Sequence, residues 1–301
     1  MPSVKNTIAL VGAFATSVLA HGTVTNFTFA GVAEPGYKLD YYYLKKNGGT
    51  PPSIPAWSAE NLDNGFIAPD AYGTVDINCH KNAAPGATSA KIAAGGKVDF
   101  LWSAWPESHI GPVLTYAAKC DGECTSADPA TLKWVKIQED GYDADKKQWA
   151  AAKLIADGNK WTATIPSDLI AGNYVLRHEI IALHGAGSEN GAQNYPQCVN
   201  VEITGSGTAN PEGTLGTALY KSTDAGILFN PYAATIDYTT PGPALFGSGS
   251  GSGSGSGATP ATPSNGTSSA APTASASAAA EDAGCSKKLR RHARDLFHAR
   301  H

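Results

Sequence analysis

Short runs of alternating apolar and polar residues recur between residues 24 and 204. This period of two is typical of strands with one buried face. Turn-forming sequences such as AAGG, ADGN and AGN separate many of the runs, and no long stretch before residue 287 has the helical period. The runs that we expect to be strands are 24–29, 97–102, 132–137, 160–165, 173–183 and 198–204.

The pattern predicts an all-β fold: an immunoglobulin/fibronectin-like antiparallel β-sandwich with long loops, followed by a disordered tail. The 226 residues from 21 to 246 suit one such domain better than two. The segment 31–78 is too long and too rich in Gly, Pro and Tyr for a simple hairpin loop. Because long loops on a rigid sandwich frequently carry function, we expect this segment to contribute to a site.

The first 20 residues have the features of a secretory signal peptide. Lys5 precedes a short apolar run that ends in small residues, and the run is too short to span a bilayer. We therefore expect cleavage after Ala20 and a secreted, extracellular protein without a transmembrane segment. His21 would be its first residue.

The composition changes abruptly after residue 246. Residues 247–286 form a Gly/Ser and then Ser/Thr/Pro/Ala-rich linker, and residues 287–301 form a basic C-terminal tail. The tail is either a helix that binds a membrane or wall surface, or a basic segment that is disordered or is clipped at its dibasic pairs, and we favour the second interpretation. Sequons at Asn26 and Asn265 are candidate glycosylation sites.

Charge excludes one class of partner. Between residues 21 and 286, 15 Lys and Arg face 25 Asp and Glu, a net charge of −10. Such a surface repels phosphate backbones, so we expect no nucleic-acid partner. A neutral polymer remains compatible with this charge.

Four cysteines precede the linker, and export favours two disulfides. Three pairings are possible. Cys120 and Cys124 in KCDGEC are close enough in sequence to close a local loop, which leaves Cys79 for Cys198. A metal site in CDGEC is the alternative, but secreted thiols usually oxidise and no histidine lies nearby.

Five segments occur in an order that resembles one enzyme family. They are HGTV (21–24), WPESHIGPV (105–113), LRHEIIALH (176–184), GAQNYPQCVNV (191–201) and NPEGTLGTALY (210–220). Together they closely resemble the fungal lytic polysaccharide monooxygenases of auxiliary activity family nine. The resemblance extends from His21 to Phe246 and does not include the linker or tail.

The resemblance implies one copper ion held by a histidine brace. His21 would supply its α-amine and a ring nitrogen, His109 a third nitrogen, and Tyr195 the axial oxygen. Cu(II) stands highest in the divalent affinity series and suits nitrogen ligands, and an amine and imidazole on one residue form a chelate. His184 and Gln193 match the family positions that hydrogen-bond near the copper-bound oxygen.

Two further interpretations concern other residues. Tyr232 matches a family position that presents an aromatic ring to the polysaccharide. Tyr42 and Tyr43 in the long loop would add another such ring, or else pack on the edge of the sandwich. A zinc-protease site is rejected, because it needs histidines four apart on a helix and His178 and His184 are six apart in a β-rich run.

We therefore expect a secreted copper-dependent monooxygenase that cleaves glycosidic bonds in cellulose or a related β-glucan. The resemblance implies O₂ or H₂O₂ as co-substrate and an external reductant or electron-donor protein, and we expect a monomer. The first alternative is a glycoside hydrolase with paired carboxylates. The second is a non-catalytic carbohydrate- or copper-binding module.

Overall fold

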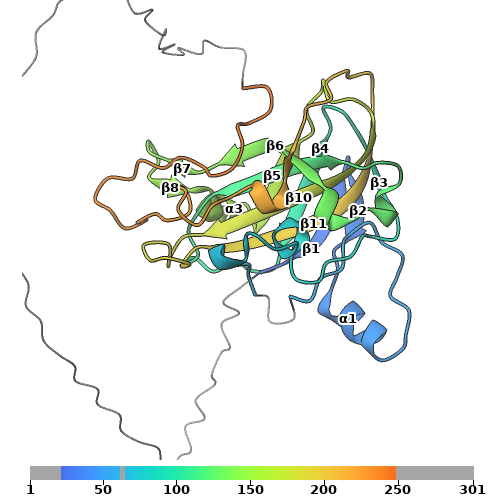
Figure 1. Ribbon diagram of the computed structural model, residues 1–301, viewed down its shortest axis with the longest axis horizontal. Coiled ribbons are helices and arrows are strands. Elements are labelled where there is room, and N and C mark those ends of the chain that lie inside the picture. The colour runs from blue at the N-terminus through green and yellow to red at the C-terminus, as the bar shows by residue number, and fades with distance from the viewer. Residues whose placement is uncertain (1–21, 62–64, 249–301) are drawn as a thin grey trace, which may run out of the picture. The chain divides into compact units, whose positions relative to one another are not determined.

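The chain folds into two packed β-sheets, one of four strands and one of six (Figure 1). The structure is a computed structural model and describes residues 22–61 and 65–248. The four-stranded sheet has the order β2 (Val32–Pro35), β1 (Val24–Phe29), β4 (Lys97–Trp102), β9 (Lys160–Thr164). The six-stranded sheet has the order β12 (Thr214–Leu215), β6 (Lys133–Asp140), β5 (Val113–Lys119), β10 (Gly172–Ala182), β11 (Gln193–Thr204), β3 (Ala90–Ala93). A separate hairpin pairs β7 (Tyr142–Asp143) with β8 (Gln148–Trp149).

These sheets confirm the expected all-β sandwich. Its strands pair antiparallel with one exception among the described residues: β3 runs parallel to β11, with Ala90 opposite Val201. Every predicted strand is present, and β11 begins five residues earlier than predicted, at Gln193.

The helices are short. They are α1 (Leu39–Lys46), α2 (Asp76–Cys79) and α3 (Ala150–Ala156), with single 3₁₀ turns at Pro69–Ala71, Cys124–Ser126, Pro129–Thr131 and Gly216–Ala218. The expected long loop therefore contains a helix that the sequence pattern did not indicate. Asp40 lies in the first turn of α1 and Lys45 and Lys46 in its last turn, the charge arrangement that the helix dipole favours. Among the described residues, none of these helices is long and apolar enough to cross a membrane.

The six-stranded sheet is buried on both faces. One face packs against the four-stranded sheet, and Phe27 and Phe100 of that sheet share one buried cluster with Leu176 of β10. Loops cover the opposite face, where Trp134 and Ile181 are fully buried. This double burial explains why β10 contains nine consecutive buried residues and shows no alternation.

The two disulfides have the favoured pairing. Cys79–Cys198 ties α2 to β11, and Cys120–Cys124 closes the loop that follows β5. The metal interpretation of CDGEC is therefore wrong, because both of its thiols are bonded to each other.

Some sequence predictions fall outside the described residues. These are the signal peptide, His21, most of the linker with Asn265 and Cys285, and the basic tail. Asn26 is described: it lies half-buried in β1, paired with Pro35 on one side and Leu101 on the other.

Candidate functional site

His109 lies in the loop that joins β4 to β5. Its backbone N–H donates to the Pro106 carbonyl at 3.0 Å, which closes a turn and turns the ring inward, where only 7% of the residue is exposed. Ring nitrogen Nδ1 lies 3.2 Å from Ser108 Oγ. The ring centroid is 4.1 Å from that of His184, so two imidazoles meet in this part of the site.

His184, Gln193 and Tyr195 gather at one end of the β10–β11 pair. The register places Gln193 opposite Ala182 and Tyr195 opposite Ile180, and His184 follows two residues after β10 ends. The fully buried Tyr195 donates its hydroxyl hydrogen to Gln193 Oε1 at 2.7 Å. Four residues predicted from sequence, His109, His184, Gln193 and Tyr195, therefore lie together.

Trp105 lies between His109 and Tyr195 and contacts both rings. Its indole ring lies edge-on to the rings of His109 and Tyr195, with centroid distances of 5.8 Å and 4.9 Å. Its Nε1–H donates to the His109 carbonyl at 3.0 Å, and its backbone N–H donates to Asn159 Oδ1 at 2.9 Å. Sequence reasoning did not single out this tryptophan, although it stands four residues before His109 in the WPESH motif.

The start of the described chain is fastened beside the same residues. Thr23 and Ser103 exchange hydrogen bonds: Thr23 N–H donates to Ser103 Oγ at 3.1 Å and Ser103 N–H donates to Thr23 O at 2.9 Å. Gln197 Oε1 accepts from Thr23 Oγ1 at 2.8 Å and from Val24 N–H at 3.4 Å. A Cβ on Gly22 would lie 2.8 Å from Trp105 Cε3, so the backbone there packs directly on the indole ring.

We call residues 22–24 with these partners the N-terminal clamp. Ser103 and Gln197 carried no signal of this role in the sequence, because their partners are 80 and 174 residues away. The clamp fixes the backbone at Thr23, two residues after His21 in the sequence.

A buried polar network lies on the opposite face of the same strands. Arg177 and Glu179 form a fully buried ion pair, and Asn194 Nδ2 and the Tyr220 hydroxyl donate to the same carboxylate. Burial is the largest single influence on the pKa of Arg177 and lowers it, but the Glu179 carboxylate together with the Tyr220 and Tyr116 hydroxyls leaves the pKa raised. The guanidinium also donates to the carbonyls of Ile77 and Asn78 beside the Cys79–Cys198 disulfide. These bonds hold the strand ends that present Gln193 and Tyr195.

His178 lies between the sheets. Its ring stacks on Phe100 with centroids 4.0 Å apart, and its Nδ1 lies 3.0 Å from Thr115 Oγ1. Burial, followed by the Arg177 charge, lowers the pKa of His178 to about 3. His178 is therefore a neutral core residue, as the rejection of the zinc-protease interpretation requires. His80 is also a core residue, with Nε2 2.8 Å from the Gly65 carbonyl.

The three tyrosines predicted to bind substrate lie on the surface. Tyr232 is 68% exposed and follows Pro231 in the loop after the last strand. Tyr42 and Tyr43 belong to α1, where Tyr43 is 46% exposed and the half-buried Tyr42 lines a pocket.

The residues present fit a copper ion only together with a ligand from outside the described segments. Within residues 22–61 and 65–248, no three His, Cys, Asp or Glu side chains form a metal-binding group. Of the expected ligands, His109 would offer an imidazole, the ligand type that copper prefers, and Tyr195 a phenol oxygen. The missing donors are those that His21 would bring, one residue before the clamp.

The sequence profile of Auxiliary Activity family 9 (formerly GH61) matches residues 21–240. The chain belongs to this family. Family 9 enzymes are copper-dependent lytic polysaccharide monooxygenases, so the protein is an oxidoreductase. Their fungal members are secreted.

Relatives from several fungi support the assignment. The family 9 enzyme cel61B of Hypocrea jecorina is 56% identical over 242 residues, which cover 79% of this chain and 97% of that protein. The family 9 enzyme H of Thermothelomyces thermophilus is 53% identical over 229 residues, which cover 76% of this chain and 66% of that protein. The solved structure of Cel61B from Hypocrea jecorina superposes with a TM-score of 0.73 over 75% of this chain and all of that one.

Proposed function

We propose that this family 9 member is a secreted, monomeric enzyme that cleaves glycosidic bonds in cellulose or a related β-glucan, using O₂ or H₂O₂ and electrons from an external donor. The convergence of His109, His184, Gln193 and Tyr195 beside the clamped start of the domain supports this proposal most directly. A solved family neighbour that is 30% identical, with a TM-score of 0.64, is described as a cellulose-active polysaccharide monooxygenase.

In this proposal copper is bound by the α-amine and ring of His21 and by the ring of His109. Tyr195 would offer its phenol oxygen to the metal as a weak ligand, held in place by the hydrogen bond from its hydroxyl to Gln193 Oε1. When bound, copper supplies the one-electron reduction and oxygen activation that no protein side chain provides. The protein contributes ligand placement, through Trp105 and the clamp.

His184 and Gln193 have a separate role in the proposal. His184 is half-buried and packs against the ring of His109, so it can hold or donate a proton beside the metal. Gln193 is also half-buried and orients the Tyr195 hydroxyl. Tyr232 offers an exposed ring that could cover the C–H face of a sugar.

A hydrolase has less support. Hydrolysis requires two carboxyl groups that flank the bond to be cut. The buried carboxylate at this end of β10, Glu179, is already bound by Arg177, Asn194 and Tyr220. A non-catalytic module would bind polysaccharide and release no oxidised ends, which makes product analysis decisive.

The test compares two forms of the full mature chain, one that begins at His21 and one with a single glycine before it. Each is incubated with cellulose, ascorbate and stoichiometric copper, and products are analysed by mass spectrometry. The His21 form should release oxidised oligosaccharides, lose this activity with EDTA and regain it with copper. The extended form should fold equally well and bind copper weakly, because acylation turns the amine into an amide.

Oxidised products at equal rates from both forms would remove His21 from the site. Unoxidised products that persist in EDTA would instead support hydrolysis. The masses and the ring position of the added oxygen also distinguish oxidation at C1 from oxidation at C4.

A further inference from the structure

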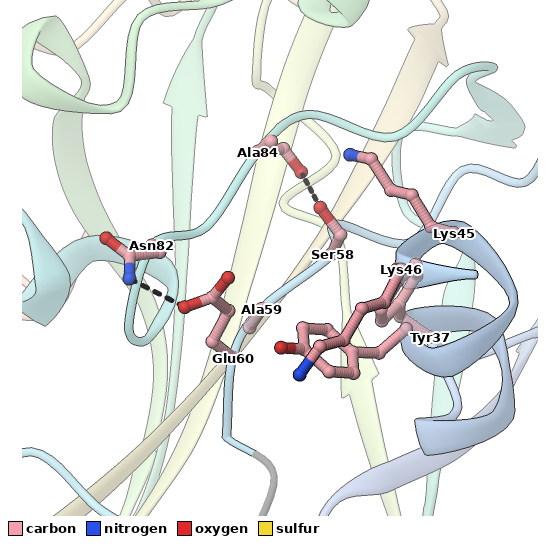
Figure 2. A pocket seen from close by; sticks show the side chains of 9 residues that line it. Tyr37, Lys45, Lys46, Ser58, Ala59, Glu60, Asn82 and Ala84 are labelled. Carbon is pink, nitrogen blue, oxygen red and sulfur yellow. Dashed lines mark hydrogen bonds between the residues drawn. The ribbon is translucent and has the colours of Figure 1, made fainter. Parts of the chain in front are cut away.

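A pocket of about 300 Å³ lies between α1 and the segments 58–60 and 82–84 (Figure 2). Its volume is at the lower end of ligand sites, which suits one sugar residue better than a chain. Tyr37 and Tyr42 contribute aromatic rings to its lining. The remaining lining is mostly polar, so an apolar ligand would leave these groups unpaired.

The polar groups divide by charge. Lys45 and Lys46 extend from α1 on one side, and Glu60 lies with Asn82 on the other (Figure 2). Asn82 Nδ2 donates to Glu60 Oε2 at 2.8 Å, which orients that carboxylate. No ion pair involves either lysine within the described residues, and Lys46 Nζ lies 5.8 Å from the Tyr42 ring centroid. Two ammonium groups therefore face the pocket in a domain with an excess of acidic residues.

The pocket continues toward the N-terminal clamp. A smaller cavity of about 50 Å³ shares Tyr37, Tyr42 and Ala59 with it and reaches Thr23. A ligand group in the pocket would therefore be connected along the surface to the segment that follows His21. This continuity favours a branch of the polysaccharide over an unrelated small molecule.

We propose that the pocket is a subsite for a uronic acid residue carried on a polysaccharide. Lys45 and Lys46 bind the carboxylate, Tyr37 or Tyr42 covers the C–H face of the ring, and Glu60, Ser58 and Asn82 accept or donate hydrogen bonds with its hydroxyls. This inference rests on the proposed function, because it assigns a preference within the polysaccharide class.

The test is a calorimetric titration of the metal-free full chain with two cello-oligosaccharides of equal length, one neutral and one that carries a single glucuronate residue. We expect the acidic ligand to bind about fivefold more tightly, since an exposed charge contact adds only a small gain in affinity. The preference should shrink in 1 M salt, where screening is strong. The K45Q/K46Q variant should bind both ligands equally.

A matched control removes the same charge elsewhere. Lys97 and Lys160 are exposed on β4 and β9, outside the pocket, so K97Q/K160Q should keep the preference. Equal binding of both ligands by the native chain, or loss of preference in both double variants, would overturn the proposal. So would inorganic phosphate that binds as tightly as the acidic ligand and displaces it, which would show an adventitious anion site. Because binding is read without copper, failure here leaves the test of cellulose oxidation unaffected.

Discussion

Replacing His178 with phenylalanine should change how stability depends on pH. The ring of His178 is buried between Phe100 and Trp102, and its pKa is lowered to about 3. In the unfolded chain the same ring titrates near ~6.5. Below that pH the unfolded state takes up a proton that the folded state refuses, so stability is full above pH ~6.5 and is lost as the pH falls toward 3.

The magnitude follows from the two pKa values. A pH of 5 lies ~1.5 units below the pKa of the ring in the unfolded chain. Protonation of the unfolded chain therefore lowers the free energy of unfolding by about 2 kcal/mol, at ~1.36 kcal/mol per unit. Phenylalanine cannot take up the proton, so H178F should recover this amount. At pH 8 the variant loses only the contact with Thr115 Oγ1, on the order of 1 kcal/mol. The difference between variant and native unfolding free energies should therefore shift by about 2 kcal/mol between pH 8 and pH 5.

Urea denaturation of the metal-free proteins at both pH values measures this shift. Copper must be absent, because its binding would add a pH dependence of its own. T115V is the matched control: it removes the same contact and keeps the histidine, so it should retain the native pH dependence. If H178F and the native chain lose stability in parallel from pH 8 to pH 5, His178 takes up its proton in the folded state and the reasoning fails.

Three further predictions concern the candidate site. H109A should lower copper affinity by at least about 100-fold in calorimetry, because it removes a proposed direct ligand and even supporting residues cost 10–100-fold; stoichiometric tight binding would refute the ligand role. Y195F should keep copper affinity within about tenfold and lower the rate of oxidation, since it removes the proposed weak oxygen ligand and leaves Gln193 Oε1 without the Tyr195 donor. Q197L should weaken copper binding and alter the copper electron paramagnetic resonance spectrum by loosening the clamp, at a cost of about 1 kcal/mol. Q138L loses the comparable bond to the Trp161 indole and should leave that spectrum unchanged.

The sequence pattern located β4 and, to within one residue at each end, β10, but it missed β5. In β4, buried residues alternate with exposed or half-buried ones, and this strand was predicted at its observed bounds. β5 has six buried residues in a row, so its sequence VLTYAAK offers no alternation. The early start of β11 was missed because QNYPQ contains a proline, which usually marks an edge or a break. Pro196 is tolerated because β11 pairs with β3 only from Val201 onward, and on that side the proline lies between two isolated bridges, Asn194 with Ile67 and Val199 with Ala56.

Motif resemblance indicated the residues of the site, and the structure brings four of them together. It could not indicate the residues that hold the N-terminal segment, because their contacts join positions far apart in sequence. Gln197 is the clearest example: its side chain accepts two hydrogen bonds from a segment 173 and 174 residues earlier. A glutamine in a strand carries no local sign of such a partner.

The glycine after His21 has a physical reason that links two of the motifs. Gly22 is buried, and any side chain there would lie 2.8 Å from the indole of Trp105. The same indole packs against His109 and Tyr195. A larger residue at position 22 would therefore displace either the start of the chain or the tryptophan that supports two proposed copper ligands. The HG and WPESH motifs thus contribute the two sides of one packing contact. A metal site that uses the chain terminus requires such a contact, because the end of a chain is otherwise free to move.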